Sequence, residues 1–103
     1  DDPYFLMEPH PESVEQAFGT NMLRCGNKHL SVFVMNLQLC LEYDGYLASI
    51  PGVDGYFGKD TKAALAEFQK EHDLEATGEA GDITKAVLWD TYCDLLMESG
   101  YAR

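Results

Sequence analysis

Hydrophobic residues recur at helical spacing along most of the chain, and glycine-containing polar stretches separate the segments in which they recur. The clearest segment runs from Leu30 to Tyr43, where one stripe at 100° per residue contains Leu30, Val34, Leu37 and Leu41. Met35 and Leu39 lie on the opposite side of that helix. A helix that is apolar on two sides needs a covering segment, and the N-terminal arm is the candidate.

The same spacing predicts three further helices. They span Glu12–Arg24, with Val14, Ala17 and Phe18 inward; Lys59–His72, with Ala64, Leu65 and Phe68 inward; and Asp82–Ser99. Loops over 46–58 and 74–81 connect the last three helices. No run alternates as a strand does, so any strand would be a very short pair in the two loops. The predicted fold class is all-α, with Leu37, Phe57, Leu65 and Phe68 in the core.

A pattern containing two glycines recurs after 23 residues, from Gly55 to Gly78 and from Gly58 to Gly81. The first glycine of each copy permits a positive φ in a tight turn, and the second precedes a helix. Thr61 and Thr84 then occupy the third helical position, where a hydroxyl could accept from free loop amides. Asp54, just before the first turn, could accept amide hydrogens in the same way.

The chain has 103 residues with a formal net charge of −11. This length predicts one core, and 46% apolar residues exclude intrinsic disorder. The acidic balance argues against nucleic acid and against anionic membranes, because both bind through Lys and Arg. No segment is long and apolar enough to span a bilayer. A chain that begins at Asp1 is expected to be a mature product or an excised piece.

Three cysteines, Cys25, Cys40 and Cys93, allow at most one internal disulfide. A Cys25–Cys93 bridge is slightly favoured over two free thiols, with Cys40 buried. A zinc site from these cysteines and His29 is the disfavoured alternative, because no second closely spaced ligand pair supports it. The sequence therefore predicts no metal and no cofactor.

Known catalytic and nucleotide-binding motifs are missing from the chain: there is no Walker loop, no H-E-x-x-H and no G-x-S-x-G. The many carboxylates of so small a helical protein are expected to form a solvated face rather than a catalytic pair. The chain is therefore predicted not to be an enzyme.

Many residues agree in order and spacing with one family. They include Val34-Met35-Asn36-Leu37-Gln38, Gly45-Tyr46, Asp54-Gly55-Tyr56-Phe57-Gly58, Thr61, Phe68-Gln69, Gly78, Gly81, Thr84 and Leu88. This pattern, from about Val32 to Tyr92, resembles the peptidoglycan-binding-like domain. Thr77 stands where that family usually has a second Asp, and Asp73 replaces a common glycine.

The resemblance implies a three-helix bundle that tethers cell-wall hydrolases to murein. Residues 1–30 are expected to form an added arm and short helix, and residues 31–103 the domain itself with an extended last helix. Apolar residues surround that helix, so either the N-terminal helix or a partner is expected to cover it. The implied location is extracytoplasmic: periplasm, cell wall or secreted.

Tyr46 and Tyr56 are the preferred ligand-binding candidates, because a tyrosine offers a flat face to a sugar and a hydroxyl to a peptide. Asp54 is the third predicted ligand contact, although its first expected role is as a turn cap. Gln38 and Gln69 are expected to be structural and to satisfy loop amides or carbonyls.

Two functions follow from these residues. The first is a non-catalytic module, of the kind found in bacterial and phage hydrolases, that binds peptidoglycan and tethers an attached hydrolase or secreted effector to the bacterial cell wall. The alternative is a protein-interaction, adaptor or inhibitory domain on the same scaffold, favoured by the surplus apolar residues of the last helix.

Overall fold

The computed structural model describes residues 12–26, 31–47 and 53–98, and in these ranges the chain forms four helices. They are α1 (Val14–Phe18), α2 (Val32–Tyr43), α3 (Lys59–Glu71) and α4 (Asp82–Glu98). Pairing between strands is limited, in the described ranges, to one isolated antiparallel bridge, so the all-α prediction is confirmed. None of the described helices has the length and apolar character that crossing a membrane requires.

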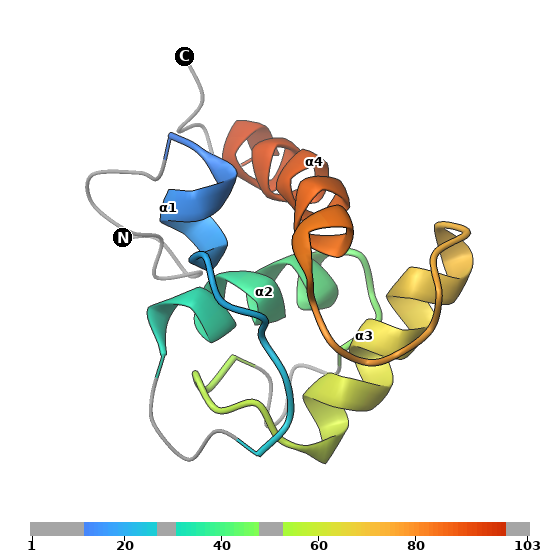
Figure 1. Ribbon diagram of the computed structural model, residues 1–103. Coiled ribbons are helices and arrows are strands. Elements are labelled where there is room, and N and C mark those ends of the chain that lie inside the picture. The colour runs from blue at the N-terminus through green and yellow to red at the C-terminus, as the bar shows by residue number, and fades with distance from the viewer. Residues whose placement is uncertain (1–11, 27–30, 48–52, 99–103) are drawn as a thin grey trace.

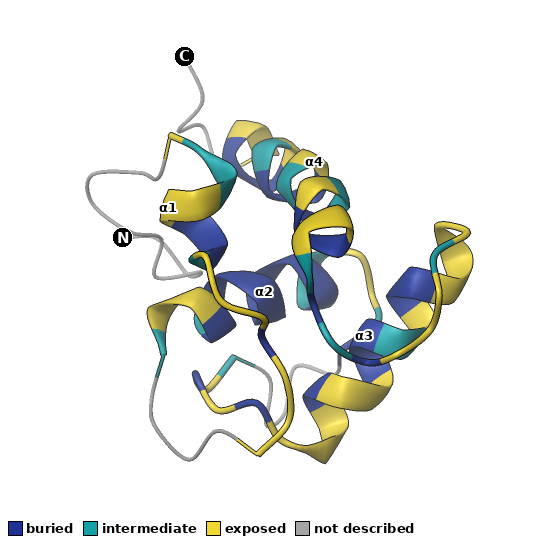
Figure 2. Cartoon of the chain, in the orientation of Figure 1, coloured by how far each residue is buried: buried dark blue, intermediate teal, exposed yellow. Residues whose placement is uncertain are grey.

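Helix α2 lies at the centre and contacts each of the other helices (Figure 1). Ser31 caps the N-terminus of this helix: its hydroxyl accepts a hydrogen bond from the Val34 amide at 3.3 Å. Leu37, Cys40 and Leu41 are fully buried, and α2 is the most uniformly buried helix in Figure 2. Leu39, on the opposite side, is 2% exposed, so the prediction that both sides are covered is confirmed. Residues 1–11 of the arm that was expected to cover it lie outside the described residues.

The predicted core is confirmed as well. Leu37, Leu65 and Phe68 have no exposed surface, and Phe57 is 2% exposed. These residues come from α2, loop one (residues 53–58) and α3. Phe18 of α1 belongs to the same cluster.

The predicted N-terminal helix is too long, because α1 ends at Phe18 rather than at Arg24. Gly19 follows with φ of +76°, a conformation that ends the helix. The chain then runs extended, and Leu23 exchanges two backbone hydrogen bonds with Ala80, of 3.1 and 2.8 Å. The sequence left open only a very short strand pair in the two loops; among the described residues, loop two (residues 74–81) pairs instead with the N-terminal segment (residues 19–26).

The apolar circumference of α4 is covered in part by α1. The Phe18 ring packs edge-on against Tyr92, with ring centres 6.1 Å apart. The Asn36 amide donates to the carbonyl of Ala17 at 2.8 Å, which fixes α1 to α2. Of the two coverings that the sequence left open, the N-terminal helix is observed, while Ile83 and Met97 stay exposed.

The three cysteines are free thiols, so the favoured Cys25–Cys93 bridge does not form. The N-terminal segment is bound at the start of α4, where the Lys85 ammonium donates to the carbonyl of Gly19 at 3.0 Å. Cys93 lies eight residues further along α4, roughly 12 Å along its axis at 1.5 Å per residue. Burial raises the pKa of the Cys40 thiol well above its ordinary value, and the charges of Asp44 and Cys93 add to the shift.

Candidate functional site

The side chain of Gln38 fastens loop one to α2. Its Oε1 accepts hydrogen bonds from the amides of Asp54 (3.1 Å) and Gly55 (2.8 Å). Its Nε2 lies within donating distance of Asp54 Oδ1 (2.9 Å), the Tyr56 carbonyl (3.0 Å) and Thr61 Oγ1 (2.9 Å). Gln38 is 1% exposed, so one buried amide fixes both the loop and the start of α3.

Gln69 of α3 does the same for loop two. Its Oε1 accepts from the amide of Gly78 at 2.8 Å. Its Nε2 lies 2.8 Å from the Glu79 carbonyl and 3.1 Å from Thr84 Oγ1, with Thr77 Oγ1 further off at 3.4 Å. The structural role predicted for both glutamines is confirmed.

The predicted partners of the two threonines are wrong. Thr61 and Thr84 were expected to accept from loop amides, yet both hydroxyls face a glutamine of the preceding helix. Gln38 and Gln69 are 31 residues apart, whereas the threonines are separated by 23. A search at one fixed period misses the glutamines, because 23 residues separate Gln38 from Thr61 whereas only 15 separate Gln69 from Thr84. An alignment of the two copies that allows a gap in the loop places Gln38 opposite Gln69.

Asp54 and Tyr56 are brought together on loop one. Asp54 Oδ1 accepts from the Tyr56 amide at 3.0 Å, which confirms the predicted turn cap. Both residues line a hollow of about 290 Å³, together with Leu47, Gly58, Lys59, Asp60 and Thr61. Tyr56 is 47% exposed, so its ring stands at the surface on a loop that the core holds in place.

Tyr46 is not among the residues that line this hollow. Its ring packs edge-on against Phe68 of α3, with ring centres 5.7 Å apart, and the residue is half-buried. Desolvation raises the pKa of its hydroxyl, and the nearby Glu71, Asp44 and Glu67 carboxylates raise it further. The hydroxyl therefore stays protonated at neutral pH and can donate a hydrogen bond.

Lys85 fixes the N-terminal segment to α4 near the second loop. The residue is 2% exposed, and its ammonium donates to the carbonyls of Gly19 and Asn21. Burial lowers the pKa of this ammonium, while the charge of Asp82 opposes the shift. Nothing in the sequence predicts this role for Lys85, because a lysine on an amphipathic helix is expected to face water.

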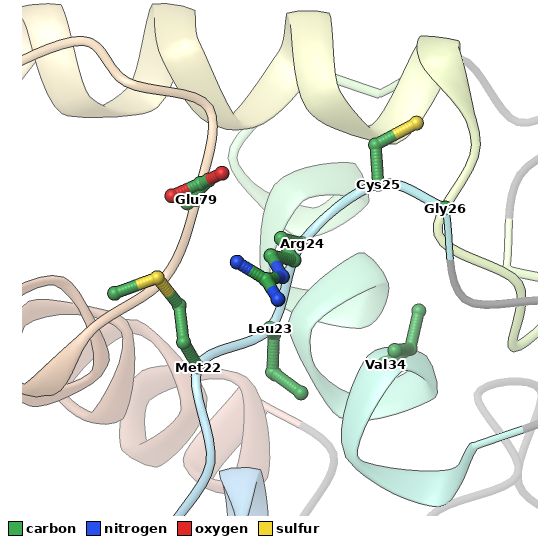
Figure 3. A pocket seen from close by; sticks show the side chains of 7 residues that line it. All are labelled: Met22, Leu23, Arg24, Cys25, Gly26, Val34 and Glu79. Atoms are coloured by element: carbon green, nitrogen blue, oxygen red, sulfur yellow. The ribbon is translucent and has the colours of Figure 1, made fainter.

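A second hollow, of about 640 Å³, lies between the N-terminal segment and loop two (Figure 3). Its lining consists of Met22, Leu23, Arg24, Cys25, Gly26, Val34 and Glu79. In Figure 3 the Arg24 side chain faces the pair formed by Met22 and Glu79. This hollow exists because the bridge between Leu23 and Ala80 draws the two segments together.

Among the described residues, no three His, Cys, Asp or Glu side chains gather closely enough to bind a metal ion. His29, a member of the disfavoured zinc set, lies outside those residues. The hollow at loop one and the start of α3 offers ring stacking by Tyr56 and hydrogen bonding by Asp54 and Lys59, which suits binding of a polar ligand.

The comparisons with known proteins agree with this geometry. A family model described as "Putative peptidoglycan binding domain" matches residues 31–88. Among solved structures, the N-terminal domain of SleB matches with a TM-score of 0.65 and 34% sequence identity. That match covers 74% of this chain and 99% of the SleB domain. No curated protein matches the chain.

The matched residues include both glutamines, both glycine turns and both threonines, and so contain both copies of the loop-to-helix connection that the glutamines hold. Helix α1 and the N-terminal segment precede the family model, and the division of the chain after residue 30 stays a prediction. Since the model spans more than half of the chain, this protein belongs to the peptidoglycan-binding domain family.

Proposed function

We propose that this domain binds peptidoglycan through the hollow beside loop one and so tethers an attached hydrolase or secreted effector to the cell wall. The observation that carries the proposal is the exposed Tyr56 ring on a loop that Gln38 clamps to the core. A loop fixed before binding loses little conformational entropy when a ligand arrives, so a shallow hollow can still bind usefully.

Asp54, Tyr56 and Lys59 supply complementary contacts in this hollow. A sugar ring would stack on Tyr56, while Lys59 donates to an acetamido or carboxylate oxygen and Asp54 accepts from a hydroxyl. The net charge of −11 gives no long-range attraction to an acidic polymer, so these short-range contacts supply the affinity. Wall binding would place the domain outside the cytoplasm, and tethering would raise the local concentration of whatever it carries.

Retention on purified murein sacculi tests the proposal. Tyr56→Ala is expected to weaken retention about tenfold, which corresponds to losing about 1.4 kcal/mol of stacking and hydrogen bonding. Met97→Ala is the matched control, because Met97 is 66% exposed at the far end of α4. Tyr46→Phe tests the third predicted contact, since it removes the hydroxyl and leaves the ring on Phe68.

Equal retention of Tyr56→Ala and the wild-type chain would overturn this assignment of the site. A folded wild-type chain that remains in solution with the sacculi would overturn murein binding itself. The alternative, a protein-interaction or inhibitory domain, is favoured by the exposed Val32, Phe33 and Met97 side chains. Cross-linking that traps a protein on these residues, without sacculus retention, would support it.

A further inference from the structure

Loop two borders a hollow of its own, which is the counterpart of the hollow at loop one. It encloses about 480 Å³ and is lined by Met22, Gln69, Leu74, Glu75, Thr77, Glu79, Gly81, Asp82, Ile83 and Thr84. Gly81 and Thr84 occupy the positions that Gly58 and Thr61 occupy in the first hollow. The two places therefore share a backbone design, while the side chains around them differ.

Three of the residues that line this hollow have large apolar side chains. Ile83 is 72% exposed and Met22 is 53% exposed, and the half-buried Leu74 lies with them. At the first hollow the equivalent of Ile83 is the charged Asp60. Exposed apolar residues that gather in one hollow are typical of a surface that a ligand or partner covers.

Met22 reaches the hollow only because the N-terminal segment is bound there. The Leu23–Ala80 pairing and the Lys85 ammonium fix the backbone on both sides of Met22. Its Cε lies 3.5 Å from the point that a Cβ on Gly81 would occupy, so Met22 packs directly over the turn into α4. This segment precedes the residues that the family model matches.

The charged residues that line the hollow are all acidic, and Arg24 of the neighbouring hollow faces one of them, Glu79. Glu75, Glu79 and Asp82 line the hollow, and no Lys or Arg is among its described lining residues. An occupant that complements these carboxylates carries an ammonium group beside an apolar part. Neutral sugars offer no such cation. The peptide stems of peptidoglycan do, through the free side-chain amine of their diamino acid in strands that are not cross-linked.

We propose that the hollow of loop two is a second subsite, which takes an amine-bearing stem peptide with its apolar part on Met22 and Ile83. The ammonium group lies against the carboxylates of Glu75, Glu79 and Asp82. This proposal rests on the proposed function, and it adds the class of ligand and the role of the N-terminal segment. Cross-linking converts the amine to an amide, so the subsite selects strands that are not cross-linked.

Titration of the full chain with two synthetic peptides tests the charge requirement. The probes are L-Ala-γ-D-Glu-L-Lys-D-Ala with a free ε-amine and the same peptide acetylated on that amine. Acetylation is expected to weaken binding about tenfold, because it removes a charge-assisted contact. Binding of the free amine should also weaken as salt rises. Equal affinity for the two peptides would overturn the proposal.

Paired variants locate the contact. Ile83→Ser and the double variant Glu75→Gln/Glu79→Gln should each lose binding of the free-amine peptide about tenfold. Met97→Ser and Glu67→Gln/Glu98→Gln are the controls, since they replace an apolar residue by serine and two glutamates by glutamine at exposed positions outside the hollow. Methyl NMR signals of Met22 and Ile83 should shift on addition of the free-amine peptide, while that of Met97 stays in place.

The remaining outcomes separate this proposal from the one on which it rests. A chitotetraose that shifts the Ile83 methyl, while the peptide does not, would assign the hollow to glycan and overturn the subsite. A dimer in light scattering that Ile83→Ser dissociates would assign it to a second copy. In both cases sacculus retention that depends on Tyr56 would leave the proposed function standing. Loss of all sacculus retention, with peptide binding intact, would overturn the proposed function instead.

Discussion

The two loop-to-helix joints share one design and differ in what supports them. In both, a buried glutamine of the preceding helix bonds to a glycine amide, to a loop carbonyl and to a threonine of the next helix. The first joint adds the Asp54 carboxylate, whereas the second has Thr77 at that position. The second joint is backed instead by the N-terminal segment, through Leu23 and Lys85.

The glutamine is therefore the part that both copies share, whereas the groups that assist it differ between the two copies. An amide side chain can donate and accept at once, so it can satisfy both the N–H and the C=O groups that a tight turn leaves unpaired. A carboxylate or a hydroxyl can then be exchanged at the edge of the turn. At the second turn, which lacks the carboxylate, the N-terminal segment bonds to the loop through Leu23 and Ala80.

The largest expected effect comes from replacing the glutamines by methionine, which has similar volume. Gln38→Met should lower the free energy of unfolding by about 3–4 kcal/mol, because the buried Gly55 amide and the Thr61 hydroxyl lose their partner. Gln69→Met should cost about 2–3 kcal/mol, since Gln69 has fewer contacts and the N-terminal segment still supports its loop. Urea unfolding measures both values.

Gln16→Met is the control for that pair, because Gln16 is exposed and its side chain accepts a hydrogen bond from the Glu12 amide at the surface. Its change should stay within about 0.5 kcal/mol. If Gln69→Met proves as costly as Gln38→Met, the N-terminal segment gives loop two no support and the comparison fails.

The next prediction compares the stability lost at two lysines that hold equivalent positions in the repeat, Lys85 and Lys62. Lys85→Met should destabilise the fold by about 1–3 kcal/mol, since the carbonyls of Gly19 and Asn21 lose a buried donor. Lys62→Met, at the equivalent exposed position of the first copy, should change stability by less than about 0.5 kcal/mol. Thermal unfolding of the two variants makes the measurement.

The pH dependence of Lys85 has a defined sign. Burial lowers the pKa of its ammonium in the folded chain below the ordinary 10.5. Below this lowered pKa the ammonium is charged in both states, so folding carries the whole cost of burying the charge. Between the two pKa values the unfolded chain binds more protons, and stability therefore rises with pH. The stability of the wild-type chain relative to Lys85→Met should increase through this alkaline window and level off above pH 10.5. A difference that falls with pH would contradict the assignment.

The smallest effect concerns two glycines with positive φ. Gly45→Ala, at φ of +85° with no atom near the new Cβ, should cost about 1 kcal/mol of backbone strain. Gly78→Ala, at φ of +76°, should cost about 2 kcal/mol, because its Cβ would come within 2.7 Å of Lys62 Cγ. Adding Lys62→Ala should recover part of the loss in a double-mutant cycle. An equal cost for the two glycines would show that Lys62 moves aside freely.

The sequence by itself determined the helical class, the buried face of α2, the two glycine turns and the family. Each of these depends on local spacing: a period of 3.6 residues, a glycine where φ is positive, or a motif of fixed length. The core positions Leu37, Phe57, Leu65 and Phe68 followed from the same periodicity and family pattern.

Only the tertiary structure decided which groups meet across the chain. Lys85 and Gly19 are 66 residues apart, and Asn36 and Tyr92 are 56 apart, so no local pattern links them. The early end of α1, the free thiols of Cys25 and Cys93, and the separation of Tyr46 from Asp54 and Tyr56 depend on such distant contacts. Packing chose among several locally acceptable arrangements, because the free energy of burying Phe18 and Lys85 depends on surfaces that form only when the helices assemble.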